Sequence, residues 1–371
     1  MNFDFSDDLK LLRDQARKFL REHSPPRAAR KVLDGEATYD VKLWNAISQM
    51  GWLGAAIPEE FGGAGLGYEG LCVLAEELGA ALAPVPVSSS IYLAGEAILR
   101  SGSDAQKQAW LPKIVTGERI GAFALAEGQG NPNPARIKAT VQAGKLSGSK
   151  LPVADGEIAD FAVVVAKGFD GQVGLYLVDL AAPEVTREPL STIDPSRNHA
   201  RLVFAEAAAE PLGGDAPGWE AVQTLLDRAA ILVAFEQVGG AQACLDMAKT
   251  YAMERYAFGR PIGSFQAIKH KLADVYVATE LARSNAYYAA WALSSDAAEL
   301  PLAAATARVS ATDAFFLAAK EDIQVHGGVG FTWDYDCHLF YRRAKLLALS
   351  LGSQRYWKDR VVAELETRNA A

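Results

Sequence analysis

Apolar residues repeat every three to four positions from Phe5 to Leu20, the spacing that places them on one face of a helix. Ser6 can cap this helix, and two aspartates follow it where the helix dipole is positive. Further helical patterns cover Val41–Gly51, Tyr68–Leu82, Ser88–Ser101 and Gln106–Val115. Residues 1–118 are therefore predicted to form an N-terminal helical domain.

From residue 121 onward the pattern changes to short runs that are rich in valine and isoleucine and bounded by turn residues. These runs are Gly121–Ala126, Ile137–Val141, Phe161–Ala166, Val173–Val178 and Arg201–Phe204. They are typical of strands in an antiparallel sheet or a small barrel, with Gly144-Lys145 as a hairpin turn. Helices do not alternate with them, which disfavours a Rossmann unit. Residues 119–213 are predicted to form a middle antiparallel β domain.

The last part of the chain, residues 214–371, is predicted to form a C-terminal four-helix bundle, which makes the whole fold α+β. Its long helical patterns are Trp219–Met253, Phe265–Ser294, Leu302–Gln324 and Asp336–Leu351. All are rich in alanine, and helices of this length that bury one face usually pack as a bundle. Because Leu302–Ala319 has few charges, we expect its face to lie at a subunit interface. The tail after Ala363 is expected to fray.

Composition and charge exclude several classes of protein. The chain has 371 residues, a net charge of −8 and 50% hydrophobic residues. The acidic balance argues against nucleic acid or an anionic membrane as a partner. The chain contains no run of 18 apolar residues, and its acidic start is unlike a signal peptide, so we expect a cytoplasmic protein without membrane insertion. Three distant cysteines and unpaired histidines argue against a disulfide scaffold and a metal site.

The first candidate for chemistry is the segment Glu254–His270, which joins two predicted helices. Arg255 ends the first helix, Phe258 and Gly259 lie in the turn, and Gln266 opens the second helix. Arginine offers a planar fork for phosphate oxygens, and a helix N-terminus adds oriented amides. The alternative is a plain helix–helix turn with a surface salt bridge.

The second candidate is Gln324–Phe331, which places three glycines within four residues after a long helix. Glycines such as Gly327 and Gly328 permit positive φ and a close backbone approach, so the turn could cradle a phosphate. It could also be only a helix C-cap. It is not G-x-G-x-x-G and follows no strand, so the dinucleotide-binding fingerprint does not apply.

Together these segments resemble the acyl-CoA dehydrogenase family. The motif E-R-x-x-F-G-x-x-I-x-x-F-Q-A matches Glu254–Ala267, Q-x-H-G-G-x-G matches Gln324–Gly330, and Y-R-x-A-K matches Tyr341–Lys345. The segments Trp52–Gly63 and Glu76–Gly79 are also similar to the family, so the resemblance spans nearly the whole chain. It implies FAD, an acyl-CoA substrate, a four-subunit assembly and an electron-transferring flavoprotein as acceptor.

The customary catalytic base of the family is absent from this sequence. In the family a carboxylate removes the α-proton of the thioester while the β-hydride goes to the flavin. The usual glutamate position, shortly after Y-R-x-A-K, holds Leu351, and the alternative position on the first long C-terminal helix holds Ala229. Asp227 and Glu236 lie on the same helix and could substitute, although each faces a different direction.

The middle domain also departs from the family, at positions that face the flavin ring. The resemblance places Ala126, Pro152 and Ala154 where other members carry threonine, tryptophan and threonine. The residues that hold the adenine and pyrophosphate of FAD across an interface in the family are intact. These are Arg255, Phe258, Gln266, Gln324, Gly327 and Gly328. This difference between the two sets of positions predicts that the chain is one subunit of an α2β2 acyl-CoA dehydrogenase. It would resemble those of bacterial steroid side-chain breakdown.

Three alternatives remain open. The chain could form a homotetramer that seats FAD through backbone contacts alone. It could be a non-catalytic structural subunit that keeps a partner in shape. It could instead be a flavin oxidase or monooxygenase of the same fold, with Asp227 as the base.

Overall fold

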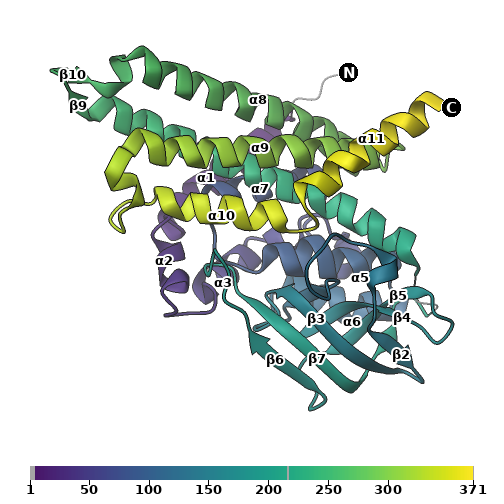
Figure 1. The fold of residues 1–371 in the computed structure, drawn as a ribbon. Helices are drawn as coiled ribbons and strands as arrows, with labels where there is room; N and C mark the ends of the chain where they lie inside the picture. The colour runs from purple at the N-terminus through teal and green to yellow at the C-terminus, as the bar shows by residue number, and fades with distance from the viewer. Residues whose placement is uncertain (1–4, 215–216, 371) are drawn as a thin grey trace. The chain divides into compact units, whose positions relative to one another are not determined.

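The structure is a computed structural model that describes residues 5–214 and 217–370 (Figure 1). The chain divides into two compact units, each assembled from segments that are distant in sequence. Unit 1 contains the chain up to residue 30, residues 68–83 and the chain from residue 230 onward, and unit 2 contains residues 31–67 and 84–229. The domain boundaries at 118/119 and 213/214 stay predictions, and residues 1–4, 215–216 and 371 lie outside the described residues.

Unit 1 is helical, as the spacing of apolar residues predicts. Its helices are α1 (Asp7–His23), α4 (Gly67–Ala80), most of α7 (Trp219–Glu254), α8 (Gln266–Ser294), α9 (Leu300–His326), α10 (Cys337–Leu349) and α11 (Gln354–Ala370). The predicted cap of α1 is confirmed, because the Ser6 hydroxyl accepts a hydrogen bond from the amide of Leu9 at 3.3 Å. The short helix α2 (Ala28–Leu33) follows α1.

Helices α4 and α7 cross with their backbones in direct contact. A Cβ atom added to Gly79 would collide with the carbonyl oxygen of Glu236, and one added to Gly239 would collide with that of Glu76. Only glycine permits so close an approach. The two glycines therefore fix how the N-terminal and C-terminal segments of unit 1 pack.

Helix α9 is the central helix of unit 1. The alanines along it, including Ala304, Ala307 and Ala311, are fully buried, and 61% of its most apolar window lies inside the chain. Core helices and membrane spans are both long and apolar. The burial of α9 therefore accounts for its mean hydropathy of 1.2, which is high enough for a membrane span. Helix α8 and other helices of unit 1 pack against α9, and the expectation that Leu302–Ala319 lies at a subunit interface stays a prediction.

Helix α8, in contrast, presents apolar side chains to solvent. Tyr276, Val277 and Leu281 are 55%, 54% and 62% exposed. They are spaced by one and four positions, which gathers them on one face of the helix. A contiguous apolar face of this kind on a long helix is typical of a protein–protein contact.

Unit 2 combines short helices with a mixed sheet. Its helices are α3 (Val41–Gln49), α5 (Glu96–Ser101), α6 (Asp104–Val115) and a π-helix over Ser88–Gly95. Its strands are β1 (Gly121–Ala124), β2 (Thr140–Gln142), β3 (Lys145–Ala154), β4 (Phe161–Lys167), β5 (Val173–Asp179), β6 (Val185–Pro189), β7 (His199–Ala208) and β8 (Glu210–Pro211). The sheet order is β6-β7-β3-β2-β4-β5-β8, with β1 beside β4.

The sheet is mostly antiparallel, with two exceptions. Strand β1 pairs with β4 in parallel. Strand β2 forms a single parallel bridge to β4, between Thr140 and Lys167. The purely antiparallel prediction is therefore incomplete, because strand composition does not encode the direction of pairing. The predicted hairpin is confirmed between β2 and β3, although its two turn residues are Ala143 and Gly144, both with positive φ.

Several elements were not predicted from the hydrophobic pattern, among them β3, β6 and α11. Strand β6 reads Val-Thr-Arg-Glu-Pro and lies at the edge of the sheet, where polar residues are tolerated. Helix α11 is strongly polar and continues to Ala370, so the expected fraying after Ala363 is wrong. Trp357, only 1% exposed, anchors this helix against Ala230 and Ala305.

Candidate functional site

The segment between α7 and α8 forms a tight hairpin. Strand β9 (Tyr256–Ala257) pairs with β10 (Arg260–Pro261), and the amide of Ile262 donates to the carbonyl of Arg255 at 2.8 Å. Phe258 and Gly259 turn the chain with φ values of 53° and 78°. The left-handed backbone at Phe258 is uncommon for an aromatic residue, and it aims the ring outward.

The predicted ligand-binding residues of this hairpin face solvent. The Phe258 ring is 96% exposed, and Arg255 and Gln266 are exposed as well. Within the described residues, the Arg255 guanidinium has no ion pair or hydrogen bond. Arg260 differs, since its guanidinium lies 4.1 Å from the centre of the Phe265 ring. The Arg255 guanidinium is therefore available to an external anion.

The glycine turn ends helix α9. Gly327 caps the helix with φ at 65°, and its amide donates to carbonyls of the last turn. A Cβ added to Gly327 or Gly328 would meet no atom within 4 Å, so both backbones border open space. The backbone next to Gln324 is therefore open and exposed, which allows another molecule to approach it closely.

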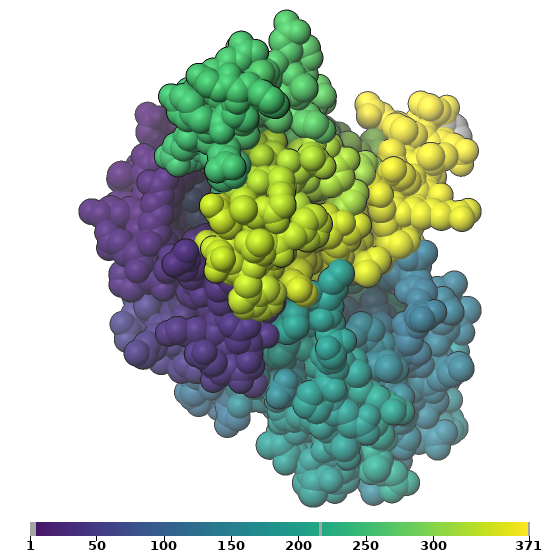
Figure 2. All heavy atoms as spheres, turned by 60° about the vertical axis from the view of Figure 1, so that its left-hand side comes forward, coloured from purple at the N-terminus to yellow at the C-terminus, as the bar shows by residue number. Residues whose placement is uncertain are grey.

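The hairpin and the glycine turn lie at the same end of unit 1. Val325 of α9 packs with Ala252 of α7, and Ile262 from the hairpin joins this cluster. Figure 2 faces this end, with the hairpin region in green and the α9–α10 region in yellow-green. Arg255, Phe258, Gln266, Gln324, Gly327 and Gly328 therefore come to one end of the unit, and together they are called the cofactor half-site below.

Beneath the glycine turn lies a buried polar cluster that the sequence reading did not identify. The donor atoms of Asp322, His326 and Cys337 lie within 4.8 Å of one another. His326 Nδ1 is 3.0 Å from the Asp322 carboxylate and 2.9 Å from the carbonyl oxygen of the same residue. Both partners are acceptors, so Nδ1 carries a proton and does not ligate a metal. The helical i, i+4 spacing of Asp322 and His326 could have revealed the pair.

Arg30 binds the loop that follows the glycine turn. Arg30 donates to the Asp336 carboxylate at 2.9 Å and to the carbonyl of Tyr335 at 2.8 Å, and it also reaches the carbonyl of Trp333. Its guanidinium lies 5.8 Å from the centre of the Trp333 ring, which is 52% exposed. These contacts order an aromatic loop beside the cofactor half-site.

The customary base position is apolar and packed. Leu351 has φ at 62° and contacts a cluster that contains Ala230, Ala305 and Trp357. The preceding segment is held by Arg308, which is buried in unit 1 and donates to the carbonyl of Ser350 at 2.9 Å. Burial lowers the pKa of Arg308 to about 9. A base cannot act from this position.

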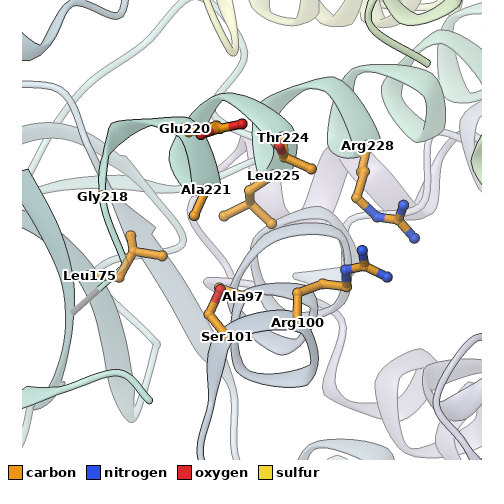
Figure 3. Close-up of a pocket in the computed structure, with 10 residues that line it drawn as sticks. All are labelled: Ala97, Arg100, Ser101, Leu175, Gly218, Glu220, Ala221, Thr224, Leu225 and Arg228. Carbon is orange, nitrogen blue, oxygen red and sulfur yellow. The ribbon is translucent and has the colours of Figure 1, made fainter. Parts of the chain in front are cut away.

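The alternative base positions lie on α7. Ala229 is fully buried, and Asp227 and Glu236 are 3% and 1% exposed. Next to Asp227, Arg228 forms an ion pair with Glu96 at 2.6 Å and lines a cavity of about 400 Å³ in unit 2 (Figure 3). Asp227 does not line this cavity, and Glu96 already balances the buried Arg228 charge.

In unit 2, the segments that correspond to the family's flavin-ring contacts carry no side-chain hydroxyl. Ala126 precedes Glu127, whose carboxylate accepts a hydrogen bond from the buried Lys150 at 2.7 Å and from two backbone amides. Burial lowers the pKa of Lys150, and the partnership with Glu127 opposes this shift. Pro152 and Ala154 lie on β3. These positions offer a flavin ring no hydroxyl or aromatic group, whereas Arg255 of the cofactor half-site offers an exposed guanidinium that suits an anionic ligand.

Comparison with known families gives one consistent match. Residues 6–118 match the acyl-CoA dehydrogenase N-terminal domain, and residues 216–365 match the acyl-CoA dehydrogenase C-terminal domain. These two matches cover well over half of the chain.

Individual relatives agree with this match. The chain is 36% identical over 362 residues to acyl-CoA dehydrogenase IpdE2 of Mycobacterium tuberculosis, covering 97% of this chain and 98% of the relative. Among solved structures, a Tcur3481-Tcur3483 steroid ACAD variant is 32% identical with a TM-score of 0.89, covering 98% and 99% of the two chains. The ChsE4-ChsE5 complex of M. tuberculosis is 29% identical with a TM-score of 0.89, covering 99% of each chain. The chain belongs to the acyl-CoA dehydrogenase family.

Proposed function

We propose that this chain is the base-lacking subunit of a heteromeric, FAD-dependent acyl-CoA dehydrogenase. In this assembly the chain lends its cofactor half-site to an FAD seated mainly in a homologous partner subunit. The assembly would contain two copies of each chain (α2β2), and the partner would supply the catalytic carboxylate.

The proposal rests mainly on the leucine at position 351, where the family resemblance places the catalytic glutamate. The Leu351 side chain packs against Trp357 and its alanine neighbours, and position 229 is also an alanine. General-base catalysis contributes roughly 10²–10⁴-fold to such reactions, so a chain without the base is a poor enzyme by itself.

The exposed cofactor half-site supports the heteromeric part of the proposal. Arg255, Phe258 and Gln266 face solvent on one end of unit 1, where a second chain could approach. Burying Phe258 alone would contribute about 2 kcal/mol to such an interface. A purely structural subunit would need none of these residues, whereas shared FAD binding requires them.

Bound FAD would supply the acceptor for the hydride that leaves the β carbon of the thioester. When FAD is bound, Arg255 would pair with its phosphate oxygens, and the exposed backbone at Gly327 and Gly328 would allow the cofactor to approach closely. Phe258 would cover the cofactor and exclude water. The partner's carboxylate would take the α proton.

The class of substrate follows from the relatives. Two of the similar solved structures are assemblies of two unlike chains, and one of them is described as a steroid ACAD. We therefore propose a bulky, steroid-derived acyl-CoA as the substrate and an electron-transferring flavoprotein as the acceptor. Three buried, free cysteines support a reducing, cytoplasmic setting.

The test is a comparison of the chain alone with the chain co-expressed with a homologous partner that carries the family's glutamate. Acyl-CoA-dependent reduction of an artificial electron acceptor should require both chains, and oxygen should be a poor acceptor. Robust turnover by the isolated chain, lost in Asp227→Asn, would favour a relocated base. Fast oxygen consumption would favour an oxidase.

A further inference from the structure

The connection between α9 and α10 runs from Gly327 to Asp336, and the proposal above uses only its two leading glycines. Its first half is a short 3₁₀ helix, Gly327–Phe331, and its second half contains only turns and bends. The side chains of Phe331 and Trp333 are 73% and 52% exposed, so burial in the core does not fix them. A connection of this kind keeps one conformation only if other contacts offset the loss of conformational entropy.

Arg30 supplies such contacts from α2, 303 residues before Trp333 in the sequence. Its side chain is 15% exposed. The guanidinium donates to the carbonyl of Trp333, to the carbonyl of Tyr335 at 2.8 Å and to the Asp336 carboxylate at 2.9 and 3.1 Å. A planar guanidinium can serve acceptors in several fixed directions at once. Because Asp336 balances its charge, Arg30 acts on this connection through geometry and is not a cation offered to a ligand.

The second half of the connection is in turn bonded to the glycine turn. The amide and the hydroxyl of Thr332 both donate to the carbonyl of Val329, at 2.9 and 2.7 Å. Val329 directly follows the two glycines. The Tyr335 ring meets the ring of His326 edge-on at 5.6 Å, and His326 directly precedes Gly327. The segment that the arginine fixes therefore contacts the glycine turn on both of its sides.

We propose that Arg30 is a positioning residue for the cofactor half-site, which holds the connection in the conformation that leaves the backbone of Gly327 and Gly328 open. This inference rests on the proposed function, because the open backbone is useful to FAD only if this chain binds FAD. A site that already has its binding conformation loses less conformational entropy when the ligand arrives. Loss of Arg30 should therefore weaken FAD binding, although Arg30 itself does not contact FAD.

The test measures the dissociation constant of FAD in the complex of this chain with its partner. Arg30→Met removes every hydrogen bond to the connection and should weaken FAD binding on the order of tenfold. Arg30→Lys keeps the charge beside Asp336 but cannot serve all three acceptors, so it should restore only part of the affinity. Arg27→Met is the matched control and should bind FAD like the wild type. It removes an exposed arginine whose side chain has no ion pair or hydrogen bond among the described residues.

Hydrogen exchange of the FAD-free chain separates positioning from general stability. In Arg30→Met the amides of residues 327–336 should exchange faster, while those of the central helix α9 keep the wild-type rate. A purely structural role would also speed exchange in the connection but would leave the dissociation constant of FAD unchanged. That result would overturn the inference and leave the proposed function intact.

The remaining outcomes are also decisive. Equal weakening of FAD binding in Arg27→Met would overturn the inference, because affinity would then follow the charge of this segment rather than the contacts of Arg30. A wild-type complex that binds no FAD would overturn both the inference and the proposed function. If Arg30→Met fails to fold, Asp336→Ala removes one of the three acceptors instead. Wild-type FAD affinity in that variant would contradict the inference.

Discussion

At the residue scale, our proposal depends on position 351, where the family resemblance places the catalytic glutamate and this chain carries leucine. Leu351 packs against a cluster that contains Trp357. Arg308 fixes the segment that precedes it through the carbonyl of Ser350. The loss of the base is thus built into the packing of unit 1.

Restoring the carboxylate should not restore the enzyme. Leu351→Glu is expected to leave the isolated chain inactive in an artificial-acceptor assay. It should also lower the free energy of unfolding by about 1–3 kcal/mol, because a carboxylate would replace an apolar side chain in a cluster without hydrogen-bond partners. Leu351→Gln, which has the same shape and no charge, is the control. Acyl-CoA-dependent turnover in the glutamate variant alone would contradict our interpretation of this position.

Arg255 should control retention of the cofactor. Arg255→Ala removes an exposed guanidinium with no internal partner among the described residues, so thermal stability should change by less than about 0.5 kcal/mol. The FAD content of the purified complex should nevertheless fall. Arg260→Ala provides the comparison, since Arg260 lies over the Phe265 ring. Unchanged flavin content in Arg255→Ala would remove Arg255 from the cofactor half-site.

At the element scale, the sequence predicted the long helices and the buried strands well. The helices repeat apolar residues every three to four positions, and β4 and β5 are continuous apolar runs that are buried along nearly their whole length. The direction of β1 was not predictable, because parallel pairing with β4 depends on tertiary context. The motif residues lie on a hairpin and at a helix end, as their pattern predicts, and their role in binding a cofactor stays a prediction. The Asp322–Cys337 contact was hidden because it joins elements across a loop.

The sequence also did not predict which faces of the alanine-rich helices are buried and which are exposed. Leu302–Ala319 and α8 are both rich in alanine. Helix α8 leaves the large apolar side chains of Val277 and Leu281 exposed, whereas Leu302–Ala319 exposes no large apolar side chain. Which alanine-rich helix is central depends on packing rather than composition. The exposed apolar residues of α8 therefore give a second candidate surface for a subunit contact.

The exposed face of α8 gives a prediction about assembly. Leu281→Glu should weaken the contact between subunits and shift the complex toward smaller species in light scattering. The free energy of unfolding of the chain itself should change little, because Leu281 is 62% exposed. Ser284→Glu, one turn further along the exposed side of α8, tests whether charge alone has this effect. An unchanged mass for the Leu281 variant would place the interface elsewhere.

Arg308 gives a prediction about stability. Its guanidinium donates to the carbonyl oxygens of Leu347 and Ser350 and to Gln237. Arg308→Leu should therefore lower the free energy of unfolding by about 3 kcal/mol, because buried acceptors lose their donor. Chemical denaturation measures this loss, and Arg355→Leu, at an 89% exposed position, should have little effect. Equal stability of the two variants would contradict a structural role for Arg308.

At the scale of the whole molecule, our proposal rests on a difference between two sets of residues. The motif residues of the cofactor half-site in unit 1 match the family, whereas Ala126, Pro152 and Ala154 of unit 2 carry no hydroxyl or aromatic group. In a homotetramer every intact part would meet an eroded one, so no complete site would form. A partner with the opposite pattern would restore one complete site in each heterodimer.

The most direct test of this account is the ratio of FAD to subunits in the purified assembly. Native mass spectrometry and flavin absorbance would be measured together on the co-expressed complex. The account predicts two unlike chains at equal stoichiometry with one FAD per heterodimer. A stable homotetramer of this chain that carries one FAD in each subunit would contradict it.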